Sequence, residues 1–260
     1  MLPTTTEIAR RLDDLISHAG VWSRLLLERA RRLEGAEESA PELRDAAATI
    51  TEGARAFRSR ATNPAASPFD LLRAADRVLS GSRVLREALE GEREAAIDPD
   101  DASWLTHEIR ALDRAGDARR GLIVPPPPGE TPAQELRALQ TLTGLIGAEI
   151  LIEFETYPLG STALTAQIGA GGAPDLPEPL EAEIAERAIR LADPLIRCEI
   201  PDWTVPPGAN GRIRISCDEA PWLDAVDHAE DWLLERTIDL DTLAEMSWDE
   251  DLDPDEAPQP

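Results

Sequence analysis

The segment Pro125-Pro126-Pro127-Pro128-Gly129 decides how the chain is divided. Four consecutive prolines fix φ and remove four backbone N–H donors, so neither a helix interior nor a central strand can continue through them. A polyproline II rod rises about 3.1 Å per residue, which predicts a stiff spacer of roughly 12 Å. We therefore expect the chain to stop here and to start again in a second folded part.

The two parts differ in charge. The chain of 260 residues has a formal net charge of −25. Up to Glu130 it has 19 arginines and 23 acidic residues, whereas from Thr131 onward 7 arginines face 28 acidic residues, so the net charges are −4 and −21. Such an acidic field repels nucleic acid and anionic membranes, because phosphate binding needs cationic side chains. We expect no direct nucleic-acid binding by the C-terminal half and no membrane binding.

Residue types that are absent or rare exclude several chemistries. Lysine is missing, so all 26 basic residues are arginines, which excludes a Walker A lysine, a Schiff base and a lysine general base. Two cysteines are too few for a disulfide framework. No apolar run approaches the roughly eighteen residues of a membrane span, and the N-terminus does not resemble a signal peptide. These observations predict a cytoplasmic protein with reduced thiols.

Residues 1–120 are predicted to form an antiparallel helical bundle. Thr4 and Glu7 form a capping box, and the apolar residues from Ile8 to Leu33 recur at helical spacing, which predicts one helix of about 28 residues. Three further helices are predicted to begin at capping residues or near a proline of the first turn, close to Ser39, Ser67 and Asp98. The long first helix is also a candidate oligomerisation surface.

Residues 133–248 are predicted to form an acidic α+β domain with a small antiparallel sheet, so the chain as a whole is mainly α. Apolar and polar residues alternate over 150–157, which favours a strand, although a helix continuing to Glu155 is the competing interpretation. Asn210-Gly211 is a hairpin signal, and the alternation from Arg212 to Cys217 predicts the strand that follows it.

Five further segments complete the predicted organisation. Helices are expected from Leu180 to Leu191 and from Pro221 to Leu233, with a short strand from Leu195 to Ile200. Residues 121–132 are predicted to be a proline-rich linker. Residues 249–260 are predicted to be a disordered acidic tail, because so acidic a segment cannot bury enough apolar area to order itself.

One group of side chains resembles a metal or acid–base site. Four residues lie at spacings of four, three and four in the final predicted helix, namely Asp224, His228, Asp231 and Glu235. An imidazole and carboxylates on one helix stripe could share a divalent cation. Because no second ligand-bearing segment is evident, the favoured interpretation is a solvated acidic face, and we expect neither a metal nor a cofactor. Cys198 and Cys217, on two predicted strands, are expected to be buried, inert thiols.

The acidic C-terminal region is interpreted as a docking surface for a protein partner with a basic surface. Complementary charge would steer the encounter, and exposed tryptophans would anchor it. The candidate partner-binding residues are Trp222, Asp224, Asp227, Asp231, Trp232, Trp248, Asp249, Glu250 and Asp251. The predicted function is a non-catalytic adaptor or subunit of a protein complex, which also docks through packing of the helical bundle.

Two other classes of function fit parts of the sequence. A DNA-mimic inhibitor of a nucleic-acid-binding protein would need carboxylates at the spacing of phosphates on a rigid surface. A metal-dependent hydrolase or nuclease would need a cluster such as Glu149, Glu153 and Glu155 together with aspartates from elsewhere in the chain.

Overall fold

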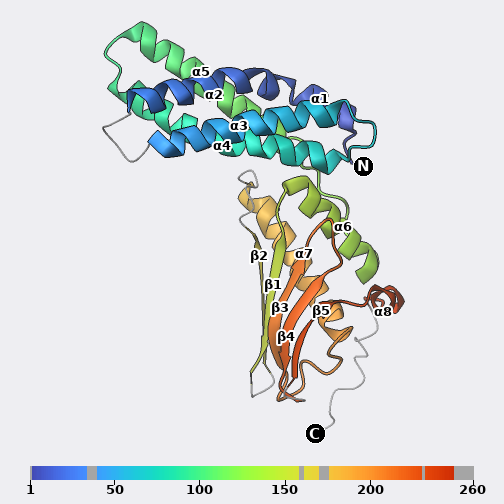
Figure 1. The fold of residues 1–260 in the computed structure, drawn as a ribbon. Coiled ribbons are helices and arrows are strands. Elements are labelled where there is room, and N and C mark those ends of the chain that lie inside the picture. Colours follow the sequence, from blue (N-terminus) through green and yellow to red (C-terminus); the bar gives the residue numbers. More distant parts are fainter. Residues whose placement is uncertain (1, 34–39, 158–160, 170–175, 230–231, 249–260) are drawn as a thin grey trace. The chain divides into compact units, whose positions relative to one another are not determined.

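The chain folds into two compact units. The computed structural model describes residues 2–33, 40–157, 161–169, 176–229 and 232–248. The first unit runs to Val124 and the second begins at Pro125. Helices build the first unit, whereas the second combines helices with an antiparallel sheet, so the predicted fold class is confirmed (Figure 1). No helix within the described residues is both long and apolar enough to cross a membrane.

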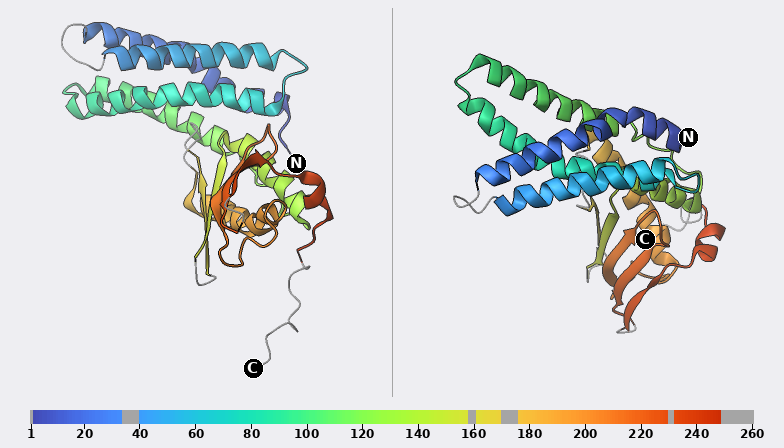
Figure 2. Two further views of the ribbon diagram at one scale, coloured as in Figure 1. Left: turned by 60° about the horizontal axis from the view of Figure 1, so that its bottom comes forward. Right: turned by 45° about the horizontal axis from the view of Figure 1, so that its top comes forward.

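The described part of the first unit is a bundle of antiparallel helices. They are α1 (Thr5–Arg11), α2 (Asp13–Arg32), α3 (Ala40–Ala61), α4 (Pro68–Ala95) and α5 (Pro99–Arg120). α3 lies between α2 and α4, and α5 packs on α4 (Figures 1 and 2). Three helices begin as the sequence predicts, because the side chains of Thr4, Ser67 and Asp98 accept hydrogen bonds from backbone N–H groups of the first turn.

The single long helix predicted between Ile8 and Leu33 is wrong. The backbone leaves the helical conformation at Leu12, with φ −104° and ψ 11°, so that α1 ends there and α2 begins at the next residue. This break lets α1 contact α4 while α2 packs on α3. The apolar stripe that would form an oligomer interface is buried inside the unit, as the exposures of Leu15, Ala19, Trp22 and Leu26 indicate. An oligomer through this helix would have to use other residues.

α3 and α4 approach each other closely because small residues lie between them. A Cβ atom on Gly81 of α4 would lie only 2.6 Å from the carbonyl oxygen of Ala46 in α3. Gly53 of α3 makes the reciprocal approach, since a Cβ there would lie 2.9 Å from the carbonyl oxygen of Ala74. The two backbones are therefore in contact at positions that accept only glycine without a shift.

A buried ion pair joins α4 to α5. Nε of Arg119 donates to Oδ1 of Asp76 at 2.7 Å, and Nη2 donates to Oδ2 at 2.9 Å. Burial raises the pKa of Asp76, and the positive charge of Arg119 opposes that shift. Because a two-point contact of this kind has one geometry, the pair fixes the register of α5 on α4.

Replacing Gly81 with alanine is expected to destabilise the first unit by about 1–3 kcal/mol, because the added methyl group cannot fit without a backbone shift. Gly91 on the same helix is the matched control. A Cβ there meets nothing within 4 Å, so Gly91→Ala is expected to stabilise the helix by up to about 1 kcal/mol. Thermal denaturation of the full chain followed by circular dichroism measures both variants. Equal shifts of the two would contradict the close approach of α3 and α4.

The second unit combines a five-stranded sheet with helices. Its elements are α6 (Pro132–Ile146), β1 (Ile150–Thr156), β2 (Thr162–Ile168), α7 (Glu178–Arg197), β3 (Ala209–Ile215), β4 (Trp222–Asp227), β5 (Trp232–Thr237) and α8 (Leu240–Glu245). All neighbouring strands are antiparallel, in the order β2-β1-β3-β4-β5. α7 contacts β1 and β2, and α6 contacts α7 and β3, so both helices pack against one face (Figure 1).

The strand predicted over 150–157 is confirmed, but three other predictions for this unit are wrong. In the range predicted as a helix from Pro221 to Leu233, the described residues include β4 and the start of β5. α7 continues through Pro194 to Arg197, where a strand from Leu195 was expected. Asn210-Gly211 lies inside β3 instead of forming a hairpin turn. In each case the pairing or packing of distant segments overrides a local signal.

The proline segment is fastened to the second unit by a buried ion pair. Glu135 on α6 is fully buried and Arg187 on α7 is 5% exposed. Nε of Arg187 donates to Oε1 of Glu135 at 2.7 Å, while Nη1 of the same guanidinium donates to the carbonyl oxygen of Pro126 at 2.9 Å. The N–H of Gly129 donates to the other carboxylate oxygen of Glu135. The spacer predicted from the prolines alone did not include this attachment.

Replacing Arg187 with methionine is expected to lower the free energy of unfolding by about 3–5 kcal/mol, because Glu135 would be left as a buried charge without its main partner. Arg197→Met is the control, since it removes a partly exposed ion pair with Asp193 on the same helix and should cost less than about 1 kcal/mol. Guanidinium denaturation of the full chain provides the comparison.

The same variants test the attachment of the proline segment. Limited proteolysis near residues 125–129 should become faster in Arg187→Met than in Arg197→Met. Similar cleavage in both variants would show that Arg187 does not hold this segment.

Candidate protein-binding face

One face of the five-stranded sheet is turned away from α6 and α7. Residues directly opposite each other on neighbouring antiparallel strands point to the same face. The face opposite the buried isoleucines of β1 and β3, which we name the open face, therefore consists of three cross-strand rows. These are Gln167, Leu151, Arg214, Trp222 and Thr237; then Thr165, Glu153, Arg212, Asp224 and Glu235; then Ala163, Glu155, Asn210, Val226 and Leu233.

The two outer rows of the open face carry solvent-exposed apolar side chains. Trp222 on β4 is 37% exposed and Leu233 on β5 is 58% exposed. Val226 lies opposite Leu233 and is partly buried, as is Leu151 on β1. Large apolar side chains on an otherwise polar sheet face mark a surface that can bind another protein.

The middle row of the open face is charged and mixed in sign. Arg212 on β3 lies between Glu153 on β1 and Asp224 on β4, and Glu235 on β5 extends the row. In the first row Nε of Arg214 lies 4.0 Å from a carboxylate oxygen of Glu149. The face as a whole has four carboxylates and two guanidiniums, so it is mildly acidic rather than uniformly negative.

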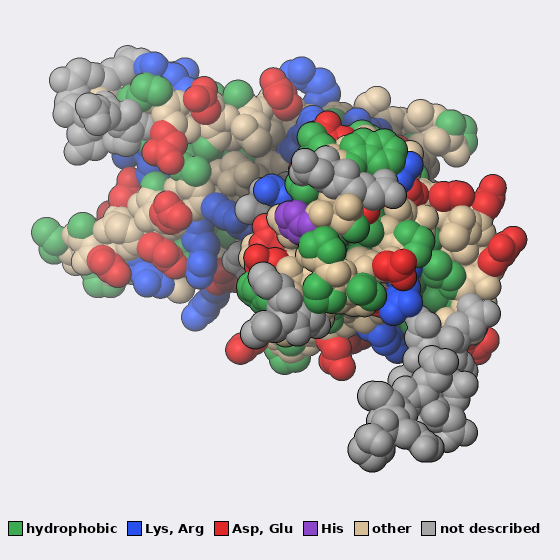
Figure 3. All heavy atoms as spheres, turned by 90° about the horizontal axis from the view of Figure 1, so that it is seen from below, with side chains coloured by type: hydrophobic (Ala, Val, Ile, Leu, Met, Phe, Trp, Pro, Cys, Tyr) green, Lys and Arg blue, Asp and Glu red, His purple; other side chains and the backbone are tan. Residues whose placement is uncertain are grey.

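The view from below shows the same mixing of charge. Acidic side chains there are scattered among hydrophobic and basic ones instead of being gathered into one patch (Figure 3). In this view, therefore, the net charge of −25 does not produce a continuous acidic surface.

The structure brings some of the predicted partner-binding residues together and separates others. Trp222 and Asp224 lie on the open face. Asp227 and Trp232 are directly opposite each other at the ends of β4 and β5, on the other face of the sheet. The predicted residues Asp231, Asp249, Glu250 and Asp251 lie outside the described part of the chain.

Trp248 lies away from the open face and contacts the proline segment. Its Nε1 donates to the carbonyl oxygen of Gly129 at 3.2 Å, and the guanidinium carbon of Arg190 lies 4.6 Å from the centre of its ring. Both contacts are within the second unit. Trp248 therefore has a structural role there, because a hydrogen bond and a cation–π contact already engage its indole.

The predicted helical stripe of His228 and carboxylates does not form, because its described residues lie on strands and a turn, and Asp231 lies outside the described residues. Asp224 and Glu235 are cross-strand neighbours, while His228 follows the end of β4. Glu153 and Glu155 project from β1 on the open face. Within the described ranges, no three or more histidine, cysteine or acidic side chains are grouped so that they could hold a metal ion.

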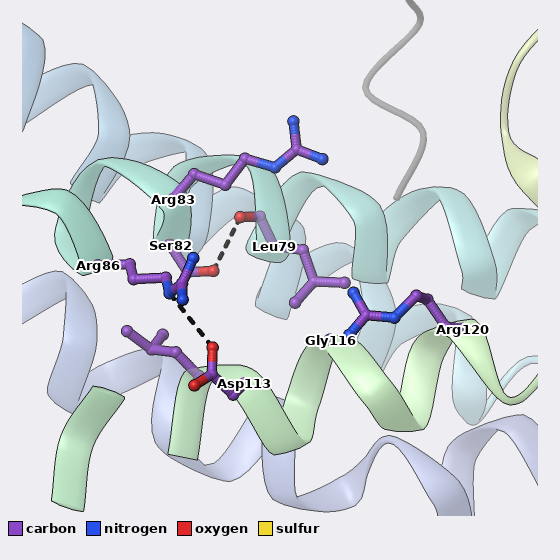
Figure 4. A pocket seen from close by; sticks show the side chains of 8 residues that line it. Leu79, Ser82, Arg83, Arg86, Asp113, Gly116 and Arg120 are labelled. Atoms are coloured by element: carbon purple, nitrogen blue, oxygen red, sulfur yellow. Dashed lines mark hydrogen bonds and ion pairs between the residues drawn. The ribbon is translucent and has the colours of Figure 1, made fainter. Parts of the chain in front are cut away.

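A shallow pocket lies between α4 and α5 of the first unit. Arg83, Arg86 and Arg120 line it together with Asp113 (Figure 4). Nε of Arg86 lies 3.2 Å from Oδ1 of Asp113, and Arg120 pairs with Asp117. Because carboxylates already pair with Arg86 and Arg120, we do not propose the pocket as a binding site.

Comparison with protein-family models, with curated proteins and with solved structures found no match.

Sequence reasoning missed Val226 and Leu233 as members of the open face. Their spacing of seven residues, together with Trp222, fitted the inner side of a helix. The residues that are buried are instead Leu223, Ala225 and Leu234. The signal for a strand was weak, because Trp222 and Val226 are apolar as well and only Asp224 separates Leu223 from Ala225.

The two cysteines lie at the ends of regular elements instead of within strands, and both are only partly buried, where buried thiols were expected. Cys198 caps the C-terminus of α7, and Cys217 follows the end of β3. Burial raises the pKa of the Cys198 thiol to about 11, and the negative charges of Glu199 and Asp239 add to the shift.

Cys198 is expected to react with iodoacetamide at pH 8 on the order of a hundredfold more slowly in the folded chain than after unfolding in guanidinium, because the raised pKa reduces the thiolate fraction. The rate should increase with pH until about pH 11. Peptide mass spectrometry of time points measures it, and equal rates in both states would contradict a protected thiol.

Proposed function

We propose that this protein is a non-catalytic adaptor or subunit of a complex, and that a protein partner with a basic surface docks on the open face. The observation that carries the proposal is the exposure of Trp222 and Leu233 on the uncovered face of the sheet. Tryptophan is among the residues that most often dominate the binding energy of protein interfaces.

The arrangement of the open face favours a specific kind of partner. The apolar rows of Trp222 and of Leu233 flank the charged row that includes Asp224 and Glu235. A complementary surface would have two apolar contacts separated by lysine or arginine side chains. The carboxylates would then steer and orient the partner, while the apolar contacts would supply most of the affinity.

The mixture of charges supports protein docking over DNA mimicry. A DNA mimic needs an uninterrupted series of carboxylates, but Arg212 and Arg214 lie among those of the open face. Two guanidiniums in the middle of the surface would repel a nucleic-acid-binding groove lined with cations. A protein interface can accommodate charges of both signs when the partner presents complementary charges.

Trp222→Ala is expected to raise the Kd of the partner by about tenfold or more, because truncation removes a large apolar contact. The partner is first identified by affinity purification of the full chain from its native host and mass spectrometry, and is then titrated as a purified protein. Trp104→Ala is the matched control, since Trp104 is a 45% exposed tryptophan on α5 in the first unit. Equal loss of affinity in both variants, or in neither, would refute docking on the open face.

The electrostatic part of the proposal has its own measurement. The double variant Asp224→Asn, Glu235→Gln should slow association and reduce its dependence on salt. An unchanged association rate and salt dependence would contradict steering by the charged row. If the partner also binds duplex DNA and DNA competes with this chain, the DNA-mimic alternative would replace the adaptor proposal.

A further inference from the structure

The edge strand β2 has unpaired backbone groups along its outer side. Two hydrogen bonds mark the ends of the β1–β2 ladder. At one end the N–H of Gly169 donates to the carbonyl oxygen of Glu149 at 2.7 Å, and at the other the N–H of Tyr157 donates to the carbonyl oxygen of Ser161 at 2.8 Å. Hydrogen-bonded pairs alternate along an antiparallel ladder. The backbone N–H and C=O groups therefore point toward β1 at residues 163, 165 and 167. They point outward at residues 162, 164, 166 and 168, and no other described strand pairs with these outward groups.

β2 also lacks the features that usually protect a sheet edge. Natural edge strands carry charges, prolines or bulges that prevent pairing with other chains. The seven residues of β2, Thr162–Ile168, include no charged residue, no proline and no glycine. The opposite edge strand β5 carries Glu235 and Arg236. Of the two edges, β2 is the one that can accept another strand.

The sequence around β2 is unusual for this chain. Charged residues make up 30% of the whole sequence, yet none occurs from Thr156 to Pro174. With a net charge of −25 on each, two copies of the chain repel each other overall. An uncharged edge is therefore a place where two copies can approach without direct contact between like charges.

We propose that two copies of this chain pair through β2 in antiparallel orientation and so join their sheets into one. In the register that uses the whole strand, Leu164 of each copy lies opposite Ala166 of the other, and the two Thr165 residues meet at the two-fold axis. The outward N–H and C=O groups of residues 162, 164, 166 and 168 then form the inter-chain hydrogen bonds.

The charge of the strand favours a second copy over the basic partner proposed above. A basic segment would gain no ion pair from an uncharged strand, whereas a second β2 is uncharged, extended and of equal length. The paired threonines would also add a favourable cross-strand contact. Strand pairing would use the outward backbone groups of β2, whereas docking on the open face would use the side chains of Trp222 and Leu233 on β4 and β5.

The oligomeric state of the full chain tests the proposal. Sedimentation equilibrium over a range of concentrations should give a species of twice the 28.3 kDa mass of one chain. Thr165→Lys should raise the dimer Kd about tenfold or more, because two like charges would meet at the two-fold axis. The matched control is Thr237→Lys on the other edge strand β5, also at an exposed position, which should leave the dimer intact.

Salt provides a second, independent readout. Because screening reduces the repulsion between two acidic chains, the dimer Kd should fall as the salt concentration is raised. Binding of a basic partner to the open face should weaken under the same change, so the two proposals fail separately. Circular dichroism verifies that both lysine variants are folded. A monomer at all concentrations and salt levels, or a dimer that Thr237→Lys disrupts and Thr165→Lys does not, would overturn pairing through β2.

Discussion

The guanidinium of Arg187 organises the second unit, because three segments meet at it. It forms an ion pair with the fully buried Glu135 of α6, it belongs to α7, and it donates to the carbonyl oxygen of Pro126. The desolvation cost of burying a carboxylate is offset only when the carboxylate is paired and hydrogen-bonded. The contact therefore orders the helices on one face of the sheet and the chain segment that enters the unit. The carbonyl oxygens of a polyproline segment can accept such a bond, because the segment has no internal backbone hydrogen bonds that would occupy them.

α6 and α7 cover one face of the sheet, and the open face is the opposite one. The helices pack over the isoleucine-rich side of β1 and β3, and the open face retains apolar residues in its outer rows. Its middle row carries charges of both signs. In the docking that we propose, Trp222 and Leu233 would supply affinity and the carboxylates would supply orientation, so the two kinds of residue would have separate functions.

Much of the fold could be predicted from local patterns, and the candidate face could not. Helix starts at Thr4, Ser67 and Asp98 follow from side chains that accept hydrogen bonds within one turn, so they are visible in a few residues. By contrast, Trp222 and Leu233 fit one side of a helix as well as one face of a sheet. Only the pairing of β4 with β3 and β5 determines which periodicity applies.

The sequence by itself determined that the chain divides near its prolines, that helices precede a mixed α and β part, and that the acidic charge is concentrated after Thr131. These properties depend on backbone geometry and composition, which are local. The tertiary structure alone decided that Arg187 fastens the prolines to the second unit, that Trp248 packs against Arg190, and that β2 is an uncharged edge. Each of these results depends on contacts between residues far apart in the sequence, and local propensity carries no information about such contacts.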